Sequence, residues 1–178
     1  MPFYDFDPPQ RFVAGTVGPP GQRVFFLQAR DLRRLVSVSC EKEQLVLLSD
    51  RLLDLLDERA GAAGAEAAAA AYADDAPLDT PIEDEFRVST LSLAWDPDRP
   101  SVVIEATPEE DGAEEQGPER EGVTPTEGLR VTMSPAQARA FARRAQALIS
   151  AGRPPCPFCG GPLDPQGHVC PRANGYRR

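Results

Sequence analysis

The stretch that decides the fold is Val131-Thr132-Met133-Ser134-Pro135-Ala136-Gln137, which is typical of a strand that runs directly into a capped helix. Ser134 can cap the helix, Pro135 suits the first helical position, and Gln137 stands where a capping box places Glu or Gln. Apolar residues then recur at helical spacing as one stripe, namely Ala138, Phe141, Ala142, Ala145, Leu148 and Ile149. The stretch therefore predicts a strand followed by an amphipathic helix that packs on a core.

The same pattern occurs 95 residues earlier, where Val36-Ser37-Val38-Ser39 matches residues 131–134 type for type and a leucine-rich helix follows at about 41–59. Two further patches pair Phe12 and Thr16 with Phe86 and Thr90, and residues 25–29 with 102–106. The separation between matched patches is 74, then 77, then 95 residues, which places an insertion of about 18 residues late in the second half. The chain is therefore expected to contain one unit twice.

Strands are expected at 11–17, 23–29, 33–38, 86–95, 101–106 and in a segment that ends at 133. The turns between them are short, which favours an antiparallel meander within each half. The sequence thus predicts an α+β fold of duplicated βββα units, in which an antiparallel sheet is covered by two helices, with a zinc ribbon or knuckle at the C-terminus.

The domain organisation follows from changes in composition. The first unit, with an N-terminal arm, spans 1–59, and the second spans 85–151. The Ala-rich and then Asp/Pro-rich segment 60–84 predicts a flexible linker, and the acidic segment 108–126 predicts an insert without packing of its own. The remaining residues, 152–178, form a C-terminal ribbon and basic tail.

The C-terminal segment carries the pattern of a metal site. Its expected ligands are Cys156, Cys159, His168 and Cys170. The run 164–167 predicts a type I turn that folds the second ligand pair back onto the first, so three thiolates and one imidazole would close a structural Zn²⁺ site. Iron is the less favoured metal, and a redox pair is disfavoured because 160–162 prevents the helix that such a pair needs. Cys40 is expected in the first turn of the first helix as a small buried hydrophobe.

Two stretches resemble known proteins. The segment around Cys156 resembles zinc ribbons that begin Cys-Pro-x-Cys-Gly. Residues 6–18 and 167–178 together resemble an uncharacterised actinobacterial family of about this length. This resemblance covers nearly the whole chain, and it implies a bacterial cytoplasmic protein without adding an activity.

Charge is distributed unevenly along the chain. The net charge is −9, but residues 129–178 hold eight arginines against one acid, Asp164. Arg139, Arg143 and Arg144 are interpreted as a solvated helix face. No apolar run is long enough to span a membrane and no signal peptide precedes the first strand, so the cytoplasm is the expected compartment.

Three classes of function remain open. The sequence favours a non-catalytic protein-binding or regulatory module with a docking surface made by Arg172, Asn174, Tyr176, Arg177 and Arg178. The first alternative is a nucleic-acid-binding protein, because tandem units of this element order resemble Whirly and PUR-type single-strand binders and the C-terminal end is basic. The second alternative is an enzyme that uses carboxylates in a sheet groove. It is less favoured because the only histidine is assigned to zinc, and because nucleotide-binding and hydrolase motifs are absent.

Overall fold

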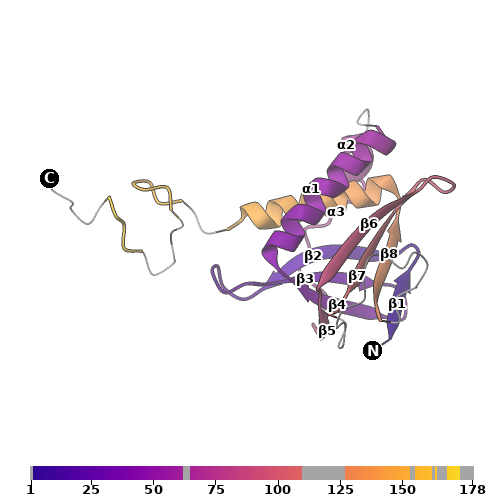
Figure 1. Ribbon diagram of the computed structural model, residues 1–178, viewed down its shortest axis with the longest axis horizontal. Coiled ribbons are helices and arrows are strands. Elements are labelled where there is room, and N and C mark those ends of the chain that lie inside the picture. Colours follow the sequence, from indigo (N-terminus) through magenta and orange to yellow (C-terminus); the bar gives the residue numbers. More distant parts are fainter. Residues whose placement is uncertain are drawn as a thin grey trace, which may run out of the picture.

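A computed structural model describes residues 2–61, 65–109, 127–152, 155–161, 163 and 168–172. It has an α+β fold in which the described residues form two four-stranded sheets and three helices (Figure 1). The fold class predicted from the sequence is confirmed at this level.

The first sheet has the strand order β2-β3-β4-β5. Strands β2 (Arg11–Val17), β3 (Val24–Arg30) and β4 (Leu35–Cys40) form an antiparallel meander. The short strand β5 (Asp84–Arg87) then joins β4 in the parallel direction. A strand from the second half of the chain therefore completes the sheet of the first half.

The second sheet repeats this arrangement with the order β1-β8-β7-β6. Strands β6 (Thr90–Asp96), β7 (Ser101–Thr107) and β8 (Gly128–Met133) pair antiparallel. Strand β1 (Phe3–Phe6), from the predicted N-terminal arm, pairs with β8 in parallel. Each sheet thus combines a meander from one half with a single strand from the other.

Helices α1 (Lys42–Arg59) and α3 (Pro135–Ser150) follow the last meander strand of each half. Both begin with a capping box whose third helical residue is a glutamine, with Glu41 and Ser134 as the N-caps. The two helices pack against each other, and α1 reaches β6 while α3 lies across β2 (Figure 1). The short helix α2 (Ala65–Ala70) packs against α3.

One apolar core joins both sheets and both long helices. Alternate residues of the strands point into it, as the two-residue period of a strand requires. Phe12 of β2 stacks on Phe141 of α3 with ring centroids 4.6 Å apart. The largest fully buried side chains include Phe6, Leu27, Leu45, Leu52, Leu56, Ile104 and Leu129.

Two predictions of local structure are wrong. The strand expected at 86–95 is divided, because the chain leaves one sheet after Arg87 and enters the other at Thr90. At this crossing the Val88 N–H donates to the Ser39 carbonyl and the Ser89 N–H to the Thr107 carbonyl, so each residue bonds to a different sheet. Cys40 is buried as expected, but it is the last residue of β4 and precedes the helix N-cap.

The segment expected to be a flexible linker, 60–84, differs from that expectation in its described part. It contains α2 and then a strap, residues 74–82, that lies on the outer face of the first sheet. Leu78 packs on Val13 and Phe26, and a Cβ on Gly15 would lie only 2.4 Å from the Leu78 side chain. Ile82 packs against the same cluster, and polar contacts with the sheet add to this apolar packing.

Gln28 and two arginines supply those polar contacts. The Gln28 side chain donates to the Asp79 carbonyl and accepts from the Asp79 N–H. The Arg11 guanidinium donates to both carboxylate oxygens of Asp74, to Asp79 and to two backbone carbonyls of the strap. Arg144 of α3 donates to the Ala76 carbonyl at 2.8 Å and also bonds to Asp74. Most of the predicted acidic insert, residues 110–126, lies outside the described residues. None of the described helices is long and apolar enough to cross a membrane.

Candidate metal centre

The first pair of candidate ligands lies on a tight backbone turn. The Cys156 N–H donates to the Gly161 carbonyl at 2.7 Å, and the Gly160 N–H donates to the Cys156 carbonyl at 2.8 Å. Gly160 has φ of 74°, a conformation that residues with a Cβ rarely adopt. This turn directs the side chains of Cys156 and Cys159 to the same place, as the sequence spacing predicts.

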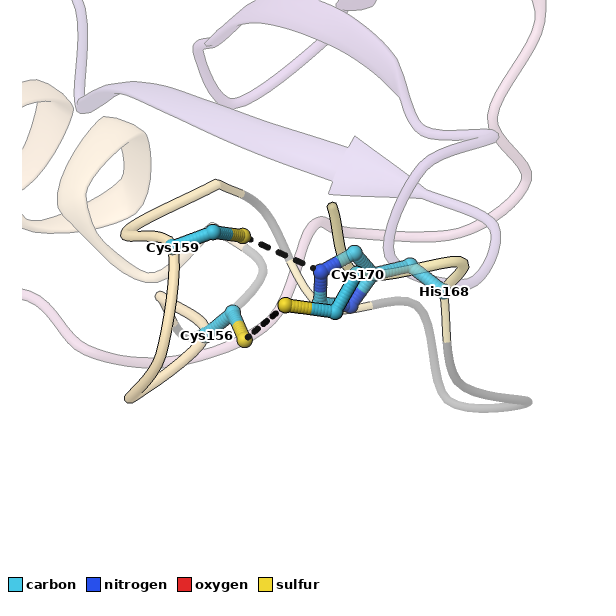
Figure 2. A group of neighbouring side chains, drawn as sticks. All are labelled: Cys156, Cys159, His168 and Cys170. Atoms are coloured by element: carbon cyan, nitrogen blue, oxygen red, sulfur yellow. Dashed lines mark hydrogen bonds between the residues drawn. The ribbon is translucent and has the colours of Figure 1, made fainter. Parts of the chain in front are cut away.

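The four candidate ligands converge on one point (Figure 2). Their ligand atoms all lie within 4.8 Å of one another. The Sγ atoms of Cys156 and Cys170 are 3.8 Å apart, and the Cys159 Sγ lies 3.2 Å from Nε2 of His168. Two thiolates on one tetrahedral Zn²⁺ would lie about 3.8 Å apart, because each Zn–S bond is about 2.3 Å long. The separations are therefore compatible with one shared metal ion, including zinc.

Burial and backbone hydrogen bonds act in opposite directions on the pKa of the Cys156 thiol. Cys156 and Cys170 are buried, and the Phe158 N–H donates to the Cys156 Sγ at 3.4 Å. Burial acts to raise the pKa of Cys156, but backbone hydrogen bonds from Cys159 and Phe158 outweigh it and hold this pKa below the ordinary value. Amide donors of this kind stabilise a thiolate, which is the form that binds metal.

The pKa of the Cys159 thiol is shifted in the opposite direction, above its ordinary value. The backbone N–H of Gly161 acts to lower its pKa, whereas burial and the neighbouring thiols of Cys170 and Cys156 raise it more. The thiols of Cys156 and Cys170 thus oppose ionisation of Cys159, as like charges at short range do. A divalent cation bound by the cluster would favour the charged form of Cys159, because a thiol coordinates metal as a thiolate.

The single histidine of the chain also fits a metal ligand. One ring nitrogen of His168 faces the thiols, and the other, Nδ1, is buried without a hydrogen-bond partner among the described residues. The donor set of three soft sulfurs and one imidazole is typical of a closed structural site.

The loops that carry the ligands also carry exposed apolar side chains. Phe158, between the first two cysteines, is 64% exposed, and Val169, between His168 and Cys170, is 79% exposed. Arg172 donates to the Phe158 carbonyl at 3.3 Å. The residues Phe158, Val169 and Arg172, here called the ribbon patch, are thus held on the two loops that the ligands join.

Sequence reasoning placed the expected docking surface further along the tail. Of the five residues predicted for it, Arg172 lies beside the metal cluster, while Asn174, Tyr176, Arg177 and Arg178 lie outside the described residues. Phe158 and Val169 were not predicted, although their positions between ligands are a usable signal. A large apolar residue inside a four-residue metal loop has too little chain around it to be buried.

Fold and site together define an α+β protein with a C-terminal Cys₃His cluster that can bind a metal ion. The chain belongs to the family described as protein of unknown function (DUF3090), whose family model matches residues 4–170. That match extends from β1 through the last candidate ligand, so the two-sheet body and the cluster belong to the same family unit. Comparison with curated proteins and with solved structures found no match.

Proposed function

We propose that this chain is a non-catalytic protein-binding or regulatory module whose C-terminal segment is a ribbon held by one structural Zn²⁺. The observation that carries the proposal is the closed ligand set, four protein atoms within 4.8 Å. A catalytic zinc keeps one position open for water or substrate, whereas four protein ligands leave none. The metal would therefore fix the shape of the ribbon.

The ribbon patch supports a docking role. Phe158 and Val169 are among the large apolar side chains that the described residues expose to solvent. An aromatic residue beside an aliphatic one and an arginine is a composition enriched at protein interfaces. Because each apolar residue stands between two ligands, metal binding would keep the patch in one shape, and a preorganised surface loses less entropy on association.

Three paired arginines of the body support a protein partner over a nucleic acid. Arg130 of β8 is paired with Glu105 at 2.5 Å, and Arg143 of α3 with Glu66 at 2.5 Å. Arg11 is likewise bound by the strap. Cations that are already neutralised by neighbouring carboxylates contribute little to phosphate binding, which depends on free positive charge.

We also propose that the two halves of the body, β1–β4 with α1 and β5–β8 with α3, derive from one duplicated unit. This unit has four strands and a helix, whereas the sequence predicts three strands and a helix. Its support is that the first strand of each half pairs in parallel with the last meander strand of the other half. The N-cap residues Glu41 and Ser134 are 93 positions apart, so the offset of 95 taken from the sequence is two residues too large. Both capping boxes then align, with Gln44 opposite Gln137.

A reducing compartment such as the bacterial cytoplasm suits this site. Three clustered cysteines would be oxidised in a secreted protein, whereas cytoplasmic thiols stay available as metal ligands. The described cysteines are all free thiols, which agrees with this location.

The proposal is tested by affinity capture of the full-length protein from cells of its source organism. A double variant, Phe158→Ser with Val169→Ser, should lose one stoichiometric protein partner while it keeps its zinc. The matched control is Leu32→Ser, because Leu32 is 88% exposed on the body and should retain the partner. If the double variant keeps the partner, the ribbon patch is not the docking surface. Ribbon-dependent binding of single-stranded DNA or RNA that weakens steeply with salt would instead favour the nucleic-acid alternative.

A further inference from the structure

A cavity of about 590 Å³ opens in the two-sheet body. It lies where the C-terminal end of α1, helix α2, the β6–β7 hairpin and the first turn of α3 meet, at the end of the body away from the ribbon (Figure 1). Pockets for small organic ligands have volumes of roughly 300–1,000 Å³. The cavity is therefore large enough for a mononucleotide, and no residue of the metal cluster lines it.

Small residues keep this space open. Alanines from α2 and from the helix ends form much of the wall, among them Ala65, Ala68 and Ala136. The Ala-rich run that carries α2 would otherwise be expected to contribute no more than a loose loop. A side chain of leucine size at one of these positions would occupy part of the cavity.

The charged residues that line the cavity have one sign. Arg59 and Arg139 line it, and none of the described lining residues is acidic, although the chain has a net charge of −9. Arg139 is 3% exposed and is paired with two carboxylates outside the lining, Asp57 at 2.6 Å and Glu66 at 3.5 Å. Arg59 forms no ion pair with any described residue. Arg139 is thus already neutralised, and Arg59 is the guanidinium of the lining that is available to bind phosphate oxygens.

Aromatic side chains complete the lining. Trp95, at the end of β6, is half-buried at the cavity, and Tyr72, just after α2, is 48% exposed. Aromatic faces stack on planar bases with little dependence on which base is present. From the volume, the unpaired Arg59 and the two rings, we propose that this cavity binds a nucleoside phosphate, with the phosphate at Arg59 and the base against the aromatic residues.

The test uses the only tryptophan of the chain as its reporter, because Trp95 lines the cavity. Full-length, metal-loaded protein is titrated with AMP, ATP, adenosine and inorganic pyrophosphate by tryptophan fluorescence, and binding is checked by calorimetry. We expect at least one of the two nucleotides to quench saturably with a submillimolar Kd. Adenosine lacks the phosphate and pyrophosphate lacks the base, so each should bind at least tenfold more weakly.

Two pairs of variants locate the binding. Ala68→Leu fills the cavity and should weaken nucleotide binding at least tenfold, whereas Ala67→Leu, on the same helix but outside the lining, should leave it unchanged. Arg59→Gln should weaken binding of the nucleotide at least fivefold and leave that of adenosine unchanged, with Arg51→Gln as its control on α1. Thermal melts establish that each variant is folded. The proposal is overturned if AMP and ATP both fail to bind at millimolar concentration, if adenosine binds as tightly as AMP, or if Ala68→Leu binds like the wild type.

Discussion

The two-sheet body and the C-terminal ribbon are held together by different forces. The body buries the inner faces of two sheets and two helices in one apolar core, so its stability grows with the apolar area removed from water. In the ribbon the buried described residues are Cys156 and Cys170, both candidate ligands. A segment of this size buries too little surface to fold by itself. We therefore expect one chain to contain a part that folds by packing and a part whose order depends on a metal.

Metal removal should give the largest difference between the two parts, with the ribbon unfolded and the body still folded. Chelation, or Cys170→Ser, should disorder residues 155–172, because coordination supplies the folding free energy of a structural zinc segment, on the order of 10 kcal/mol or more. NMR spectra should lose the dispersed amide signals of the ribbon while far-UV circular dichroism of the body stays unchanged. Cys40→Ala is the control, since Cys40 lies in the body core. Collapse of the body on chelation would show that its fold depends on the metal too.

Truncation in the core should produce the reverse pattern. Phe141→Ala removes a ring that is 3% exposed and stacked on Phe12, so it should lower the free energy of unfolding of the body by about 3–5 kcal/mol. Leu53→Ala should cost less, about 2 kcal/mol, because Leu53 is only partly buried against the core. Chemical denaturation measures both effects, and metal content should not change. Neutral results for both would remove the helices from the shared core.

Removal of the buried Arg139 should lower the free energy of unfolding by less than the core truncations do. The comparison with Arg143, on the same helix, separates a buried position from an exposed one. Arg139→Ala should destabilise the body by about 1–2 kcal/mol, because it removes a packed side chain and leaves Asp57 unpaired. Arg143 is 50% exposed, so Arg143→Ala should stay within about 0.5 kcal/mol. Equal effects in urea denaturation would contradict the different burial of the two side chains.

The smallest expected effect is the pH dependence of stability that comes from Asp74 of the strap. Hydrogen bonds from Arg11 hold the pKa of Asp74 below its ordinary value of 3.8 in the folded protein. The charged carboxylate therefore stabilises the fold above pH 3.8, and this contribution is lost as the pH falls through the lower folded pKa. Asp74→Asn should be less stable than the wild type at neutral pH, and the difference should shrink between about pH 4 and pH 2. A difference independent of pH would show that the Asp74 charge adds nothing.

In the body, the features that depend on neighbouring residues in the sequence were predicted correctly. The strand β2 has the expected bounds, and the cap of α3 uses Ser134, Pro135 and Gln137 in the expected roles. These features depend on neighbouring residues, which a single sequence displays. The exchange of β1 and β5 between the sheets was not predicted, because each has only four residues and its partner strand lies in the other half.

Long-range polar contacts explain the remaining differences in the body. The interpretation of Arg139 and Arg144 as solvated is wrong. Glu66 of α2 and Asp57 of α1 bind the Arg139 guanidinium, and the Arg144 side chain is only 14% exposed because it bonds to the strap. The Ala-rich segment looked unable to pack, yet Arg11 binds the strap that follows it from 63 residues away. Pairing over such distances leaves no periodic signal in the sequence.

The ligand cluster was predictable because its spacing alone constrains the backbone. Two residues between the cysteines permit one tight turn, and alternate residues of an extended segment place His168 and Cys170 on one side. The exposure of Phe158 and Val169 was not predicted, although the short spacing between ligands on either side of each residue is a signal for it.

The measurement that tests the central claim most directly is X-ray absorption spectroscopy with metal analysis, on full-length protein purified under reducing conditions without chelator. The account predicts one zinc per chain with three sulfur ligands at about 2.3 Å and one nitrogen at about 2.0–2.1 Å. It is contradicted if the protein holds no stoichiometric metal, if Cys156 and Cys159 form a disulfide in the native state, or if an exchangeable water oxygen occupies one of the four positions.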